Sequence, residues 1–177
     1  GPEEILRLDN QVRERLGLRE RGGHIVQPWV YGKDYRKLAT LELSYRFDSL
    51  VKVENPLFAM EEPERAELFL DGRPVEFEEC GWWTDESLRT TMLPAIEPGE
   101  HELLVKIAYS NSGNVEKCFL LGDFGVELRG DSARLTAPVR ELYWGDATRQ
   151  GLPFYGGNIT YHCHFNLKEA QELCRRA

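Results

Sequence analysis

Short segments in which apolar and polar residues alternate recur through this sequence from residue 39 onward. In Ala39–Phe47, apolar side chains occupy every second position, as in a strand with one buried and one solvent-facing side. His101–Tyr109 alternates in the same way. Turn-forming residues separate such segments at intervals of roughly 8–12 residues, which is typical of antiparallel sandwiches. The sequence therefore predicts an all-β protein built as an antiparallel β-sandwich.

Turn residues place further strands. Asp71-Gly72 supplies the positive backbone dihedrals of a tight hairpin turn between Glu67–Leu70 and Arg73–Phe77. The other predicted strands are Arg89–Leu93, Lys117–Leu121, Gly125–Arg129, Ala133–Ala137 and Ile159–Phe165.

A helix is predicted at each end of the chain. Ile5, Leu8, Val12 and Leu16 recur at helical spacing, and Gly17 or the pair Gly22-Gly23 is expected to end that helix. Its solvated face is predicted to hold Arg13, Glu14, Arg15, Arg19, Glu20 and Arg21. Asn166 and Glu169 resemble a capping box at the start of a short C-terminal helix. We therefore divide the chain into a helical segment (1–24), a β-sandwich domain (25–166) and a C-terminal helix or truncated end (167–177).

Composition limits the partners. A chain of 177 residues with 41% hydrophobic content can bury one core, so one compact domain is expected. A net charge of −8, without a clustered Lys/Arg face, argues against nucleic acid. The apolar runs are too short to cross a bilayer, so no membrane partner is predicted. Four widely spaced cysteines, Cys80, Cys118, Cys163 and Cys174, favour reduced, mostly buried thiols and thus a cytoplasmic location.

Two aromatic-polar clusters are candidate binding sites, because sugar rings stack on aromatic planes while polar side chains bond their hydroxyls. Trp82 and Trp83 are adjacent, so on a strand they face opposite ways, and with Asp85 they form a candidate sugar platform. The alternative is that one tryptophan fills the core and the other covers a loop. The second cluster lies on a loop and comprises Tyr143, Trp144, Asp146, Arg149, Gln150, Phe154 and Tyr155. The alternative is that Phe154 and Tyr155 plug the end of the sandwich.

Catalytic and metal-binding patterns are weak. His162 and His164 would share one face of a strand, but no third zinc ligand lies nearby in the sequence, so a polar outer face is favoured. The serines lack a nucleophile-elbow context. Nothing in the sequence brings two carboxylates together in a cleft, as glycosidases require. We therefore predict no catalytic residues, no metal ligands and no cofactor in this chain.

The stretch from Trp144 to Tyr161, Trp-x-x-x-x-x-Gln-Gly-x-Pro-Phe-Tyr-x-Gly-x-x-x-Tyr, resembles a signature of jelly-roll modules in large bacterial glycoside hydrolases. These are the galactose-binding-like "sugar-binding" β-sandwiches of family 2-type and α-L-rhamnosidase-like proteins. The other matching stretches are Ala66–Val75, Gly81–Ser87 followed by Pro98–Leu103, and Phe119–Val126. Together the matches cover roughly residues 39–165.

The resemblance implies a jelly-roll sandwich that is a non-catalytic, carbohydrate-associated module of a larger glycosidase-like protein. Its partners would be carbohydrate or neighbouring domains of the same polypeptide. A structural calcium ion is possible, because such folds often hold one. Two alternatives stay open: a purely architectural interdomain sandwich, or a part of a hydrolase active site shared with another domain. Gly1-Pro2 looks like the scar of a cleaved tag. Compared with a complete module, the chain starts in a helix without preceding strands and ends soon after the last predicted strand, so we expect it to be a fragment.

Overall fold

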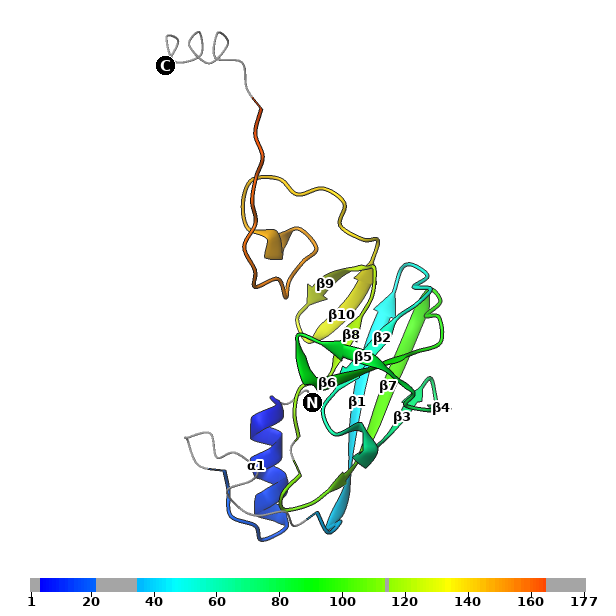
Figure 1. The fold of residues 1–177 in the computed structure, drawn as a ribbon, viewed down its shortest axis with the longest axis vertical. Helices are drawn as coiled ribbons and strands as arrows, with labels where there is room; N and C mark the ends of the chain where they lie inside the picture. The colour runs from blue at the N-terminus through cyan, green and yellow to red at the C-terminus, as the bar shows by residue number, and fades with distance from the viewer. Residues whose placement is uncertain (1–3, 22–34, 114, 165–177) are drawn as a thin grey trace.

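The computed structural model describes residues 4–21, 35–113 and 115–164 (Figure 1). Within them lie one α-helix, α1 (Ile5–Arg15), and two short 3₁₀ helices, η2 (Pro63–Arg65) and η3 (Ala147–Arg149). The strands are β1 (Ala39–Ser49), β2 (Leu57–Met60), β3 (Ala66–Leu70), β4 (Arg73–Val75), β5 (Glu79–Trp83), β6 (Asp85–Met92), β7 (Gly99–Tyr109), β8 (Phe119–Leu121), β9 (Gly125–Arg129) and β10 (Ser132–Thr136).

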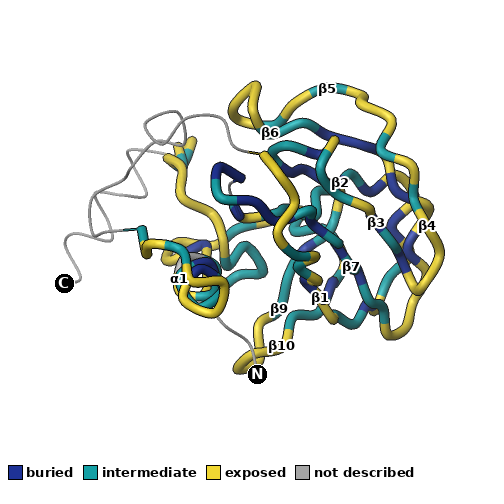
Figure 2. Tube along the Cα trace, turned by 90° about the horizontal axis from the view of Figure 1, so that it is seen from below, coloured by how far each residue is buried: buried dark blue, intermediate teal, exposed yellow. Residues whose placement is uncertain are grey.

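These strands form two sheets, so the predicted all-β, sandwich-like architecture is confirmed. The six-stranded sheet has the order β4-β3-β7-β1-β10-β9 and the four-stranded sheet the order β5-β6-β2-β8. One hydrophobic core joins them: Phe58 of β2 belongs to the same buried cluster as Leu43 of β1 and Val105 of β7. Figure 2 shows buried residues along inner strands such as β7, and exposed residues along the edge strand β4.

The alternating segments form strands as predicted. β1 pairs with β7 over its whole length, and the core residues Leu43 and Val105 lie directly opposite each other. Asp71 and Gly72 have φ values of 51° and 74°, so they form the left-handed turn expected between β3 and β4. One pairing departs from an all-antiparallel sandwich, because β10 runs parallel to β1. The two strands are far apart in sequence, and local turn signals say nothing about the direction of such a pair.

The predicted strand Ile159–Phe165 is wrong for its described part, since residues 159–164 have no strand structure. Residues 137–164, here called the extension, run beyond the sheets after β10 (Figure 1). A strand forms only where the edge of another strand can pair with it. The edge strand β9 bonds a different part of the extension, because the Val126 N–H donates to the Gly151 carbonyl at 3.0 Å. The predicted C-terminal helix, 167–177, lies outside the described residues, and the domain limits 25–166 stay a prediction.

Helix α1 forms where the apolar periodicity predicts it, and its side chains Ile5, Leu8 and Val12 pack against the core. Gly17, with a φ of 68°, follows its last turn as a left-handed residue, which is the helix end that the sequence predicts.

The predicted solvated face of α1 is wrong for Arg13, which is only 4% exposed. Its Nε donates to the Arg19 carbonyl at 2.7 Å, and its Nη2 donates to Asn111 Oδ1 at 3.0 Å. Arg21 is also largely buried and lies 2.8 Å from the buried carboxylate of Asp9. The sequence predicted these arginines to be exposed to solvent because they are charged. Instead, their guanidinium groups bond backbone and side-chain oxygens where α1 meets the end of β7.

Candidate functional site

Strand β5 places the adjacent residues Trp82 and Trp83 in different surroundings, and its pairing with β6 shifts in register between them. The Trp83 ring lies 4.7 Å from the ring of Phe119 on β8, measured between centroids, and is half-buried. Trp82, in contrast, is 58% exposed. The alternation in the sequence therefore predicted the arrangement correctly: one tryptophan packs and the other faces solvent.

The side chains beside Trp82 are set by the register of β5 and β6. Trp82 pairs with Arg89 of β6, and directly paired residues project from the same face of a sheet. The Arg89 guanidinium forms ion pairs with Glu64 of η2 and, at 3.6 Å, with Glu79 at the start of β5. Trp82, Arg89, Glu64 and Glu79 are here called the Trp82 cluster.

The polar groups of the Trp82 cluster reach solvent, and the carboxyl of Glu64 is held ionised. Partial burial by itself raises the pKa of Glu64, but a hydrogen bond from its own backbone N–H and the charge and hydrogen bond of Arg89 lower it overall. The side chains of Glu64 and Glu79 are 61% and 55% exposed, and that of Arg89 is 31% exposed. A carboxylate held ionised in this way accepts hydrogen bonds and is poorly suited to act as a general acid.

Asp85, the third residue of the predicted platform, shapes the hairpin between β5 and β6. Its Oδ1 accepts a hydrogen bond from the Ser87 N–H at 2.8 Å, and the bonds from Ser87 lower the pKa of the Asp85 carboxyl. Thr84, between Trp83 and Asp85, has a φ of 60°. Asp85 therefore stabilises the tight turn that presents Trp82, and the structure assigns it no contact with the cluster.

In the extension, Gln150 and Asp146 hold the loop together. Gln150 accepts from the Tyr143 N–H at 2.7 Å and donates to the Tyr143 carbonyl at 3.1 Å. Asp146 caps η3 by accepting from the Thr148 N–H at 2.9 Å. The polar side chains that the sequence offered for ligand binding are thus engaged within the loop. This includes Arg149, which is 88% exposed but whose Nε lies 3.8 Å from Asp146 Oδ2.

The aromatic side chains of the extension point outward. Tyr143, Trp144 and Phe154 are between 75% and 77% exposed, and Tyr155 is 42% exposed. The Trp144 ring lies 4.3 Å from the Tyr161 ring, and the Tyr155 hydroxyl donates to the Asn158 carbonyl at 2.8 Å. The alternative in which Phe154 and Tyr155 plug the end of the sandwich is therefore wrong. The two predicted clusters lie on elements attached to different sheets, and the structure does not bring them together.

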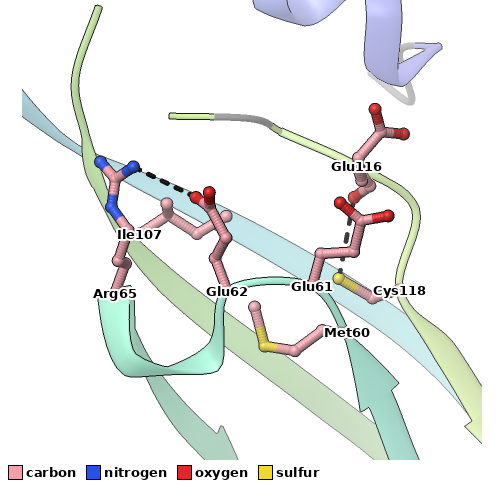
Figure 3. Close-up of a pocket in the computed structure, with 7 residues that line it drawn as sticks. All are labelled: Met60, Glu61, Glu62, Arg65, Ile107, Glu116 and Cys118. Atoms are coloured by element: carbon pink, nitrogen blue, oxygen red, sulfur yellow. Dashed lines mark hydrogen bonds and ion pairs between the residues drawn. The ribbon is translucent and has the colours of Figure 1, made fainter. Parts of the chain in front are cut away.

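A small hollow between the sheets is too small for a ligand (Figure 3). It measures about 10 Å³, which is room for about one water molecule. Its lining comprises Met60, Glu61, Glu62, Arg65, Ile107, Glu116 and Cys118. Burial raises the pKa of the Cys118 thiol to about 11, so at neutral pH it is a protonated thiol and a poor nucleophile. Cys80 and Cys163 are exposed, so the prediction of mostly buried thiols is wrong for both, and Cys174 lies outside the described residues.

Among residues 4–21, 35–113 and 115–164, no three histidine, cysteine or acidic side chains gather as metal ligands. His162 and His164 are exposed and do not lie on a strand. The structural calcium ion stays a prediction. In the same part of the chain, no helix has the length and apolar character that crossing a bilayer requires.

No protein-family model, curated protein or solved structure matches this chain. Its function must therefore be inferred from its own residues. Sequence reasoning found Trp82 but missed Arg89, Glu64 and Glu79. Arg89 was placed correctly on a strand, but its pairing with Trp82 needed the register of the hairpin.

Proposed function

We propose that this chain is a non-catalytic, carbohydrate-associated module of a larger glycosidase-like protein, and that it contacts sugar through the Trp82 cluster. The observation that carries the proposal is the exposed indole of Trp82, which pairs across the hairpin with Arg89, and the two carboxylates that form ion pairs with that guanidinium. An indole plane suits the apolar C–H face of a sugar ring. The Arg89 fork donates hydrogen bonds to sugar hydroxyls, while Glu64 and Glu79 accept them.

The Trp82 cluster suits this role better than the extension does. Its charged groups come from β5, β6 and η2, which are packed elements, and they keep solvent-facing oxygens. The corresponding groups of the extension, Gln150 and Asp146, already bond its backbone. Because the cluster is an open surface, we expect weak binding with a Kd of about 1 mM, or about −4 kcal/mol.

The finer fold proposed is a galactose-binding-like jelly roll. Its support is that the stretches resembling such modules fall on paired elements of the two sheets. Ala66–Val75 spans β3 and β4, and Phe119–Val126 spans β8 and the start of β9. The parallel pairing of β1 with β10 departs from the antiparallel pairing of such a jelly roll.

Tryptophan fluorescence of the chain, titrated with galactose, rhamnose and oligosaccharides that contain them, tests the sugar contact. We expect a saturable shift in the wild type. Trp82→Ala should raise the dissociation constant about tenfold or more, which corresponds to about 1.4 kcal/mol of binding free energy. Arg89→Lys should also weaken binding, because lysine keeps the charge but lacks the planar fork. The matched control is Trp144→Ala, which removes an even more exposed tryptophan outside the cluster and should bind like the wild type. A flat response across the panel would refute the sugar contact.

An architectural role is the second candidate, and the aromatic surface of the extension favours it. Tyr143, Trp144 and Phe154 expose most of their area, and exposed aromatic groups of this kind are enriched at protein interfaces. If the role is architectural, the isolated chain should self-associate through this surface. The double variant Tyr143→Ser, Phe154→Ser should then be monomeric in analytical ultracentrifugation. A wild-type chain that stays monomeric at high concentration would argue against it. Sugar titration of the same double variant separates the two functions, because the Trp82 cluster is untouched.

A further inference from the structure

His101, near the start of β7, is held between two hydrogen-bond acceptors. Its Nδ1 lies 2.8 Å from Asp71 Oδ2, and its Nε2 lies 2.7 Å from the Glu97 carbonyl oxygen. The side chain is only 10% exposed, and its ring stacks on Phe47 at a centroid distance of 5.5 Å. Water therefore has little access to either ring nitrogen.

The two acceptors dictate the protonation state of the ring. A carbonyl oxygen carries no proton, and a carboxylate accepts hydrogen bonds only, so both ring nitrogens must donate. A neutral imidazole has one N–H and can satisfy one of these partners; an imidazolium satisfies both. We propose that His101 is a pH-dependent latch, whose doubly protonated ring fastens the β3–β4 turn to the loop before β7, and which opens as the proton is lost.

The charges around His101 favour the closed latch. Burial by itself lowers the pKa of His101, but the hydrogen bonds to Asp71 and Glu97 and the charges of Asp71 and Asp48 raise it overall. Asp71 is itself held ionised: partial burial raises its pKa, while bonds from the Glu102 N–H and His101 and the charge of Arg73 lower it.

Two of the other carboxylates near His101 form ion pairs of their own. Asp48 of β1 bonds Arg134 at 3.0 Å, and the Glu97 carboxylate bonds Lys52 at 3.2 Å. Glu100 of β7 lies opposite Asp48.

The latch joins segments that are distant in sequence. Asp71 Oδ1 accepts from the Glu102 N–H at 3.0 Å, and the Asp71 N–H donates to the Glu102 carbonyl at 2.9 Å. Glu97 follows Ile96, whose backbone bridges to Val53. When His101 loses a proton, one of its two hydrogen bonds breaks. The ring then no longer joins the hairpin turn to the loop, while Asp71 keeps its bonds to the backbone of Glu102.

Nitrogen-15 NMR of the imidazole rings in the whole chain tests the latch directly, with His101→Gln used to assign the signal. Both ring nitrogens should carry a proton at pH 6, and the titration should lie above the ordinary histidine value of about 6.5. Asp71→Asn should move it to lower pH, because the amide keeps an acceptor but removes the charge. Asp131→Asn, the same change in the β9–β10 turn, should leave it in place. A ring with one bare nitrogen at pH 6, or no response to Asp71→Asn, would overturn the proposal.

The same latch predicts a pH dependence of stability with a definite sign. A histidine whose pKa is raised on folding stabilises the fold fully below its unfolded pKa, and this stabilisation disappears as pH rises through the folded pKa. In urea unfolding, the excess stability of the wild type over His101→Gln should therefore be largest below about pH 6.5. The corresponding ratio of unfolding constants should shrink by up to about tenfold per pH unit in the titration range. A difference that does not vary between pH 5 and pH 9 would contradict the latch.

Discussion

Asp9→Ala is expected to lower the free energy of unfolding by about 3–5 kcal/mol, the usual cost of removing one partner from a buried charge network. The Asp9 side chain is only 4% exposed and serves two groups at once. Its Oδ1 accepts from the Tyr109 hydroxyl at 2.7 Å, and its Oδ2 lies 2.8 Å from Arg21 Nε. Removal of the carboxylate leaves the charge of Arg21 and the hydroxyl of Tyr109 in a site that water hardly reaches.

The pKa of Tyr109 is raised to about 12. Burial is the largest cause, and the hydrogen bond and negative charge of Asp9 add to it. Urea unfolding measures the predicted loss. Glu14→Ala is the matched control, because it removes one carboxylate from the exposed side of the same helix and should change the stability by less than about 0.5 kcal/mol. If Asp9→Ala cost no more than Glu14→Ala, α1 would not be fastened to β7 through buried charge.

Phe58→Ala is the second large effect, with an expected loss of about 3–5 kcal/mol of unfolding free energy. Phe58 is 1% exposed on β2, and it belongs to the core cluster that joins the four-stranded and six-stranded sheets. Truncation removes apolar burial and leaves a cavity that two paired sheets cannot easily close.

Denaturant unfolding monitored by circular dichroism measures this loss. Leu128→Ala is the control, because Leu128 of β9 is 47% exposed and its truncation should cost less than about 0.5 kcal/mol. Equal effects of the two substitutions would mean that Phe58 does not fill a shared core.

The fold could be predicted where local chemistry decides it. Ala39–Phe47 and His101–Tyr109 alternate because one face of each strand meets the core, and Asp71-Gly72 encodes its own turn. Ile159–Phe165 alternates as well, but a strand also needs a free partner edge, which no local pattern reports. The burial of Arg13 was missed for a related reason: its oxygen partners include Asn111, far along the chain.

The candidate site was predictable only in part. Adjacent positions on a strand predicted that one of Trp82 and Trp83 would be exposed, and the structure shows which one. The polar partners of Trp82 depend on the β5–β6 register and on where η2 lies, both of which are set by tertiary packing. In the extension, the mix of aromatic and polar residues suggested that Gln150 contacts a ligand. In the structure its side-chain amide bonds the backbone of Tyr143 instead.

The most direct measurement of the proposed function is a two-dimensional NMR titration of the labelled chain with galactose and rhamnose oligosaccharides. The indole N–H of Trp82 and the Arg89 side chain should shift together and saturate, while the indole of Trp144 stays unchanged. Shifts confined to Trp144 and the extension, or no saturable shift at all, would contradict a sugar contact at the Trp82 cluster.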